Sequence, residues 1–349
     1  MSDLVFAPKA SQFTLSTILQ TVSSLVLLVY ISIALGCAII AVFSDIMGKL
    51  KKNKQKEEFA ANCIQIATGN FGVGFLFGVV PALSIFLSYS QFLFGQHTPV
   101  SEYFLWAALF NLIGLLFLNK YREAFHLKKH AHESAEAQDV LEDAQTAISY
   151  SGPAGVAFLL VGSYFLVGGS AIAIDPGLWQ YGFIVIFSSI QVWLKYAAFL
   201  CGAIGLAGVA LIFFFHSWNG GLKHVSEEIK ESALLGGSTL AIVFIPLYVI
   251  FTGLHLKFIP RADFSLSICV FSALAIFVLF IALHMVYYTL AHKNIVAGHL
   301  GFIFCILSFL FVILADNDTR ENALRKQTFQ LIKNSPAGHS GASSGSTKH

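Results

Sequence analysis

The stretch SLSICVFSALAIFVLFIALHMVYYTLA, residues 265 to 291, decides the fold of this chain of 349 residues. It contains no Asp, Glu, Lys or Arg. As a helix it is longer than the roughly 20 residues that cross the hydrocarbon core of a bilayer, and a helix satisfies its own backbone there. The next run, VAGHLGFIFCILSFLFVILA at 296 to 315, has the same character. Together the two runs predict a pair of adjacent membrane-spanning helices.

The composition extends this prediction to the whole chain. Hydrophobic residues make up 56% of it and charged residues 11%, and the mean hydropathy is +0.73. Soluble domains are about a quarter charged, so a bilayer is the expected solvent. The apolar runs are continuous rather than alternating, which excludes a β-barrel. We predict an all-α, polytopic transmembrane helical bundle of eight spans, at 15–44, 62–94, 103–119, 153–173, 193–217, 234–255, 265–291 and 296–315.

The connections between the spans predict the orientation. Lysine and arginine gather in alternate connections, at 45–61, 120–152, 218–233 and 292–295, and such connections face the cytoplasm. Both termini then lie outside.

Three segments follow from this topology. We expect a transmembrane helical domain over 1–315 and a short helix on the outer face over 316–333, capped by Asp316 or Asn317. The Gly/Ser-rich residues 334–349 are expected to be a disordered tail.

Several classes of function lack support in the sequence. The net charge is +2 and the basic residues lie in the connections, which excludes nucleic-acid binding. None of the five cysteines is spaced as CxxC or CxxCH, so neither a covalent c-type haem nor a zinc knuckle is encoded. No HExxH, P-loop or GxSxG motif occurs, so hydrolytic and nucleotide-driven chemistry have no motif either.

Histidines inside the apolar runs are the first candidate site. An ionisable side chain in hydrocarbon needs a partner, which makes His284 and His299 functional candidates. The orientation places both near the inner leaflet, with His216 close by. Neutral imidazoles on neighbouring helices can hold a b-type haem, so we predict His284 and His299, or either with His216, as haem and metal ligands. The alternative is that His284 hydrogen-bonds within the bundle and His299 is interfacial.

Glycines in the second span are the next candidates. In TGNFGVGFLFGVVPALSIFLSYSQFLFG, residues 68 to 95, Gly72, Gly74 and Gly78 precede Pro81, which should kink the helix. Small residues at this spacing allow either another helix or a flat cofactor to approach. Both interpretations stay open: helix packing, or the wall of a haem or quinone site.

The run from Tyr181 to Trp218 is about twice as long as one crossing needs. It predicts an interfacial helix up to Gln191, followed by a turn into the membrane near Trp193. Lys195 is then either an anchor whose ammonium reaches the outer interface, or a lysine within the membrane that contacts an anionic group. His97 and His255 belong to the outer face, apart from the inner histidines.

Two stretches resemble a known family. KEEFAANCIQIATGNFGVGFLFGVVPALSIFLSYSQFLFG, residues 56 to 95, and DNDTRENALRKQ, residues 316 to 327, are similar to subunit I of the cytochrome bd-type quinol oxidases and to related bd-like eight-span subunits of c-type cytochrome electron-transfer complexes. This chain departs from the oxidases in three ways. Residues 15–44 contain no histidine, Lys195 stands in VWLKYAAF where relatives carry a histidine, and the predicted spans contain no acidic residue. The resemblance implies an electron-transfer subunit without a complete oxygen-reducing centre.

We therefore expect a multi-pass subunit of a quinol-linked oxidoreductase complex in the respiratory chain of a bacterial inner (plasma) membrane. It would pass electrons from a membrane quinol to a partner c-type cytochrome on the outer face, with haem b and quinone as cofactors. The contrasting hypothesis is a transporter or a structural or assembly subunit that holds no cofactor.

Overall fold

A computed structural model describes residues 10–94, 96–131, 138–216, 225–259 and 265–333. Within these ranges the chain is helical and contains no strand, and eight helices are long and apolar enough to cross a membrane. This confirms the predicted all-α bundle of eight spans. The helices are α1 (Ala10–Lys51), α2 (Lys54–Thr68), α3 (Phe71–Gly74), α4 (Val80–Phe92), α5 (Val100–Ala131), α6 (Gln138–Ala173), α7 (Val185–Ser188), α8 (Ile190–Phe215), α9 (Glu227–Leu256), α10 (Leu266–His292) and α11 (Ile295–Lys333).

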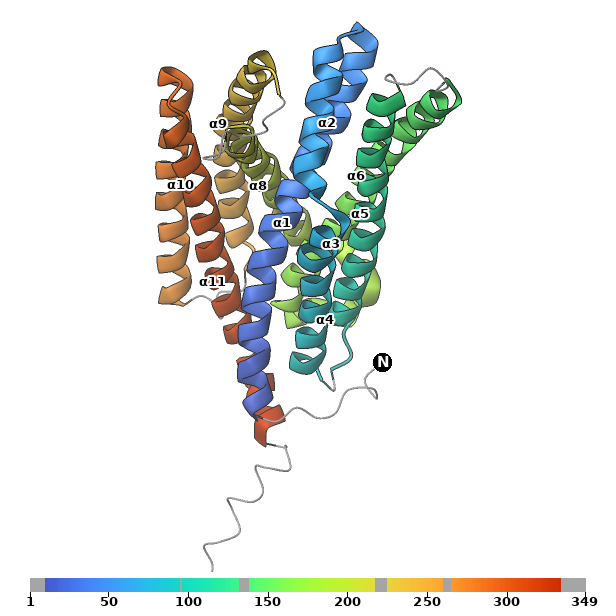
Figure 1. The fold of residues 1–349 in the computed structure, drawn as a ribbon. Coiled ribbons are helices and arrows are strands. Elements are labelled where there is room, and N and C mark those ends of the chain that lie inside the picture. Colours follow the sequence, from blue (N-terminus) through green and yellow to red (C-terminus); the bar gives the residue numbers. More distant parts are fainter. Residues whose placement is uncertain (1–9, 95, 132–137, 217–224, 260–264, 334–349) are drawn as a thin grey trace, which may run out of the picture.

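The long helices stand side by side, and α1 begins at the same end of the bundle at which α11 ends (Figure 1). A hydrogen bond of 2.6 Å from Asn317 Nδ2 to Thr21 Oγ1 joins these two helices near that end. We call it the outer end, because the charges of the connections predict that it faces outside. The opposite end, which carries the α1–α2 and α10–α11 turns, is the inner end.

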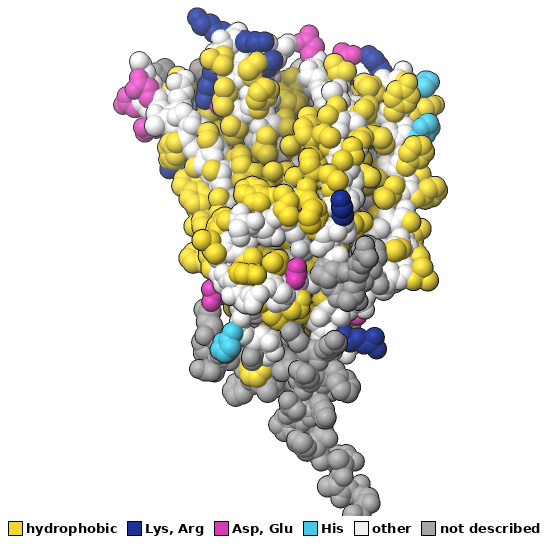
Figure 2. Space-filling model, turned by 180° about the vertical axis from the view of Figure 1, so that it is seen from behind, with side chains coloured by type: hydrophobic (Ala, Val, Ile, Leu, Met, Phe, Trp, Pro, Cys, Tyr) yellow, Lys and Arg dark blue, Asp and Glu magenta, His cyan; other side chains and the backbone are white. Residues whose placement is uncertain are grey.

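The surface of the bundle is that of a protein in a bilayer. Apolar side chains cover the middle of the face shown in Figure 2, and most charged side chains lie at its two ends. Large apolar residues point outward from α10, where Phe277 is 61% and Phe280 69% exposed. Soluble proteins rarely expose apolar patches of this extent. The chain is a multi-pass membrane protein.

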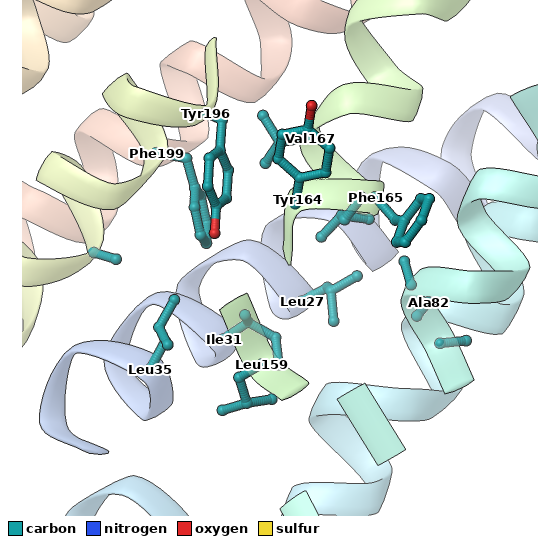
Figure 3. Close-up of a cluster of buried hydrophobic side chains, with 14 of the residues drawn as sticks. Leu27, Ile31, Leu35, Ala82, Leu159, Tyr164, Phe165, Val167, Tyr196 and Phe199 are labelled. Atoms are coloured by element: carbon teal, nitrogen blue, oxygen red, sulfur yellow. The ribbon is translucent and has the colours of Figure 1, made fainter. Parts of the chain in front are cut away.

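Two clusters of buried apolar residues meet at α8. The first joins α1, α4, α5 and α6 to α8, and the second joins α8 to α9, α10 and α11. Figure 3 shows Leu27, Ile31 and Leu35 of α1 in the first cluster, together with Leu159 and Val167 of α6 and Phe199 of α8. Beside the second cluster, the backbones of α8 and α9 come very close together: a Cβ added to Gly208 would lie only 2.5 Å from the carbonyl oxygen of Gly237. Small residues permit this close approach of spans.

The second predicted span, 62–94, is divided. Helix α2 ends at Gly69, whose φ of +53° is in the left-handed region, and Asn70 caps the next helix by accepting a hydrogen bond of 2.8 Å from the Val73 amide. Arg122 of α5 donates a hydrogen bond to the Gly69 carbonyl. A π-helical segment, Phe75–Val79, then precedes Pro81, which cannot donate to the helix ladder. A widened π-helical turn thus directly precedes Pro81, and the kink predicted at Pro81 stays a prediction.

The connection before α8 agrees with its prediction in outline. A 3-10 helix, Pro176–Ile184, and the short α7 precede an extended residue, Ser189, where the chain turns into α8. The turn comes four residues before the predicted position at Trp193, since Ser189 rather than Trp193 leaves helical geometry.

The last helix differs from the expected pair of helices. Helix α11 runs from Ile295 to Lys333 without a break, so residues 316–333 continue the last span and do not form a separate helix. Neither expected cap residue ends or begins a helix, because their side chains have other partners. Asp316 pairs with Lys195, and Asn317 bonds to Thr21 and to Arg320.

Candidate functional site

A cavity of about 280 Å³ lies inside the outer half of the bundle. Residues from eight helices line it: α1, α4, α5, α6, α8, α9, α10 and α11. Most of its wall is apolar, with side chains such as Leu28, Ile85, Phe199 and Phe309. We call it the outer cavity. Its volume is near the lower end of the range of about 300–1,000 Å³ for small-molecule sites.

One end of the outer cavity carries an ion pair. Lys195 Nζ of α8 lies 2.9 Å from Asp316 Oδ2 of α11. The lysine side chain is 15% exposed and the aspartate side chain 42% exposed. Lys195 therefore contacts an anionic group, and its depth relative to the outer interface stays a prediction. The last span continues past residue 315 and includes Asp316, so the expectation that the spans contain no acidic residue was wrong.

A buried histidine stands beside this ion pair. His255, near the end of α9, lines the outer cavity and is only 4% exposed. It is near enough to Lys195 and Asp316 for electrostatic interaction with both, and it faces the main chain of Gln191. Neither ring nitrogen makes a hydrogen bond of normal geometry with the described residues. Buried polar groups usually have such a partner, so this ring stands out.

A buried arginine lies behind the same end of the cavity. Arg320, 2% exposed, stacks its guanidinium over Phe92 at 4.9 Å and over Tyr89 at 5.9 Å, and Tyr89 lines the cavity. Its Nη1 donates a hydrogen bond of 3.2 Å to Asn317 Oδ1, while Nη2 has no partner among the described residues. The cavity thus joins apolar walls to a polar end containing three ionisable groups and a cation behind them: an arrangement that suits an amphipathic molecule.

The predicted inner histidines lie elsewhere. The side chain of His284 is exposed on α10, whereas His299 is 2% exposed and packs edge-to-face on Phe213, with ring centroids 5.2 Å apart. His299 also contacts the main chain of His216, the C-cap residue of α8. The structure thus brings His216 and His299 together and leaves His284 on the surface.

The three predicted glycines lie where the second span packs. Added Cβ atoms on Gly74 and Gly78 would meet Tyr30 of α1 and Leu115 of α5, at distances from 2.7 to 3.8 Å. Gly72 faces open space apart from the side-chain oxygen of Asn70, at 3.3 Å. Gly74 and Gly78 therefore lie against α1 and α5, and Gly72 does not.

A second cavity, of about 260 Å³, lies at the inner end between the α1–α2 turn, α8 and α9. Glu228 and Gln55, which are hydrogen-bonded to each other, are among its lining residues. None of His216, His284, His299, Gly72, Gly74 and Gly78 lines either cavity. The described residues contain no cluster of three or more His, Cys, Asp or Glu side chains that could hold a metal ion.

Comparison of the chain with protein-family profiles, with characterised proteins and with solved structures found no match. The function is therefore inferred from the residues of the outer cavity.

The sequence contained a weak signal for these residues. Lys195 and His255 are polar residues within apolar runs, and Asp316 directly follows one. Their meeting depends on how α8, α9 and α11 pack against one another, and no local sequence pattern predicts that packing.

Proposed function

We propose that this protein is a membrane subunit of a quinol-linked redox complex, and that the outer cavity binds the quinol. The observation that carries the proposal is the outer cavity itself, with its apolar walls and with Lys195, His255 and Asp316 at one end. A quinol is likewise apolar over most of its length and polar at one end, since its ring carries two hydroxyl groups and an apolar tail.

The polar groups match what a quinol headgroup needs. A hydroxyl both donates and accepts a hydrogen bond, and a neutral imidazole offers one donor and one acceptor. Lys195 adds further donors, and Asp316 adds acceptors. Oxidation of a quinol to a quinone releases two electrons and two protons. At the outer end these protons have a short path to the outside through Asp316, whose side chain is 42% exposed.

The electrons need an acceptor, for which we propose a cytochrome bound at the outer end. A b-type haem in this chain stays a prediction. Of the predicted ligands, His216 and His299 are the pair that lie together. Bound haem would supply one-electron transfer.

Quinone binding tests the proposal directly. Gly253 is exposed and lines the outer cavity, and a Cβ added there meets no atom within 4 Å, so Gly253→Phe adds a large side chain at the rim of the cavity with no clash at the Cβ. Gly236 lies on the same helix with equally open space but lines the inner cavity, which makes Gly236→Phe the matched control. We expect saturable binding of decylubiquinone to the protein in lipid nanodiscs, weakened about tenfold or more by Gly253→Phe alone. No saturable binding would exclude the quinol site.

A transporter is the contrasting function, and one observation bears on it. Transporters often place substrate and ions at the ends of interrupted helices, and the second span is interrupted at Gly69. Here, however, Arg122 takes the free carbonyl and Asn70 caps the following helix. The broken ends are satisfied within the chain, which favours the quinol site. Solute uptake by proteoliposomes that contain no chromophore would favour the transporter.

A further inference from the structure

The charged groups around the polar end of the outer cavity are two cations, Lys195 and Arg320, and two carboxylates, Asp316 and Glu321. Lys195 is paired with Asp316, whereas Arg320 forms no direct ion pair in the part of the chain that the structure describes and interacts with Asp316 and the exposed Glu321 only at longer range. The neighbours of Arg320 are the Asn317 amide and the faces of two aromatic rings. A buried guanidinium whose Nη2 makes no hydrogen bond to a described residue, and which no carboxylate contacts directly, is only partly compensated, so a negative charge placed in the cavity would be stabilised.

Hydrogen-bond donors are available for that negative charge. The ammonium of Lys195 has three N–H donors, of which Asp316 takes one. The imidazole of His255 carries an N–H in either neutral tautomer, and no described residue accepts it in normal geometry. Both side chains line the outer cavity. Hydrogen bonds from such groups to an ionised oxygen are roughly twice as strong as those between neutral groups.

We infer that the outer cavity binds its ligand as an oxyanion, with Lys195 and His255 donating hydrogen bonds to the charged oxygen. This inference rests on the proposed function, since the oxyanion of a quinol site is the ionised ring hydroxyl, a quinolate. Arg320 acts through its field and not by contact, because Tyr89 lies between it and the cavity. The ring and tail of the ligand lie against the apolar wall.

Two ring analogues that differ in charge test the inference. 2-Hydroxy-1,4-naphthoquinone is an anion at neutral pH, and its methyl ether, 2-methoxy-1,4-naphthoquinone, is neutral at every pH. Binding of each is measured by equilibrium dialysis against the protein in phosphatidylcholine nanodiscs. We expect the hydroxy compound to bind about tenfold or more tightly than the methoxy compound, the gain typical of one charge-assisted hydrogen bond.

Variants assign this preference to residues. We expect Lys195→Gln to remove it, and His255→Phe to reduce it severalfold. Lys257→Gln, which changes an exposed lysine at the same end of α9, should leave it intact. Since Lys195→Gln leaves Asp316 unpaired, the double variant Lys195→Gln/Asp316→Asn gives the same test without an unpaired carboxylate.

The outcomes separate the inference from the proposed function. Equal binding of the two analogues, weakened for both by Gly253→Phe, would leave the quinol site standing and overturn the oxyanion. No binding of either analogue would overturn both. A lipid phosphate is the other source of an oxyanion, so the titration is repeated with phosphatidylglycerol in the nanodisc. If phosphatidylglycerol abolishes the preference, the anion is a lipid headgroup and the quinolate is overturned.

Discussion

Lys195 and Asp316, which are 121 positions apart in the sequence, form an ion pair of 2.9 Å that joins α8 to α11 at the outer cavity. The pair is partly shielded, with side-chain exposures of 15% and 42%. Removing one partner from a shielded pair leaves an unpaired charge, whereas replacing both partners by apolar residues does not. This asymmetry gives the first prediction.

We expect Lys195→Met to lower the free energy of unfolding by about 1–2 kcal/mol, less than for a fully buried pair because Asp316 reaches solvent. The double variant Lys195→Met/Asp316→Leu should recover part of this loss. The measurement is the free energy of unfolding by SDS titration in mixed micelles. A double variant less stable than Lys195→Met would show that Lys195 does not stabilise the protein through its ion pair with Asp316.

The contact between Gly208 and Gly237 gives a second prediction. A Cβ on Gly208 would lie 2.5 Å from the Gly237 carbonyl oxygen, so Gly208→Ala must push α8 and α9 apart. Overpacking of this kind costs about 1–3 kcal/mol. Gly236→Ala, the neighbouring position with no atom within 4 Å, is the control and should be neutral or slightly stabilising. The midpoint of thermal unfolding in nanodiscs measures both. Equal midpoints for the two variants would contradict the close approach.

The glycines of the second span give a third prediction, which separates helix packing from a cofactor wall. Gly78→Ala places a Cβ 2.7 Å from Leu115 Cδ1, so we expect a loss of stability of about 1 kcal/mol, with an unchanged content of extractable quinone. Gly72→Ala meets only the Asn70 side chain and should be within about 0.5 kcal/mol of the parent protein. Loss of quinone with no loss of stability in Gly78→Ala would instead assign this glycine to a cofactor site.

The inner histidines give a fourth prediction. Because the His284 side chain is exposed, we expect His284→Ala to change stability by less than about 0.5 kcal/mol and to leave any b-type α-band in the reduced-minus-oxidised spectrum intact. His299 is 2% exposed, so His299→Ala leaves a buried space and should cost about 2 kcal/mol or more. An α-band lost in His284→Ala at unchanged stability would identify His284 as a haem ligand on the surface of the bundle.

The sequence predicts the fold well because the bilayer imposes a strong local rule. Each span must be an apolar helix, so a run such as 265–291 can be recognised without knowing its neighbours. The ends of the spans follow less closely. Helix α11 passes 315 because Asp316 and Asn317, which resemble a cap in the sequence, bond to other helices in the structure.

The candidate site is harder to predict because it depends on which helix faces meet. His284 and His299 have similar apolar surroundings in the sequence, yet one faces outward and the other packs on Phe213. The hydropathy of α10 is nearly uniform around the helix, so the pattern does not identify its inner face. His255 lies at the opposite end of the bundle from His216 and His299, as expected, but its relation to Lys195 and Asp316 appears only once α8, α9 and α11 are packed together.

The continuity of α11 has a mechanical consequence. From Asp316 to Lys333 the helix rises by about 25 Å at 1.5 Å per residue, with no hinge at which it could bend away from the span. A displacement of its outer part is therefore carried rigidly to Asp316, and so to the partner of Lys195. Asp316 lines the outer cavity and belongs to the same unbroken helix as the last turns of α11. We therefore expect a probe placed on those last turns to respond when the cavity is occupied.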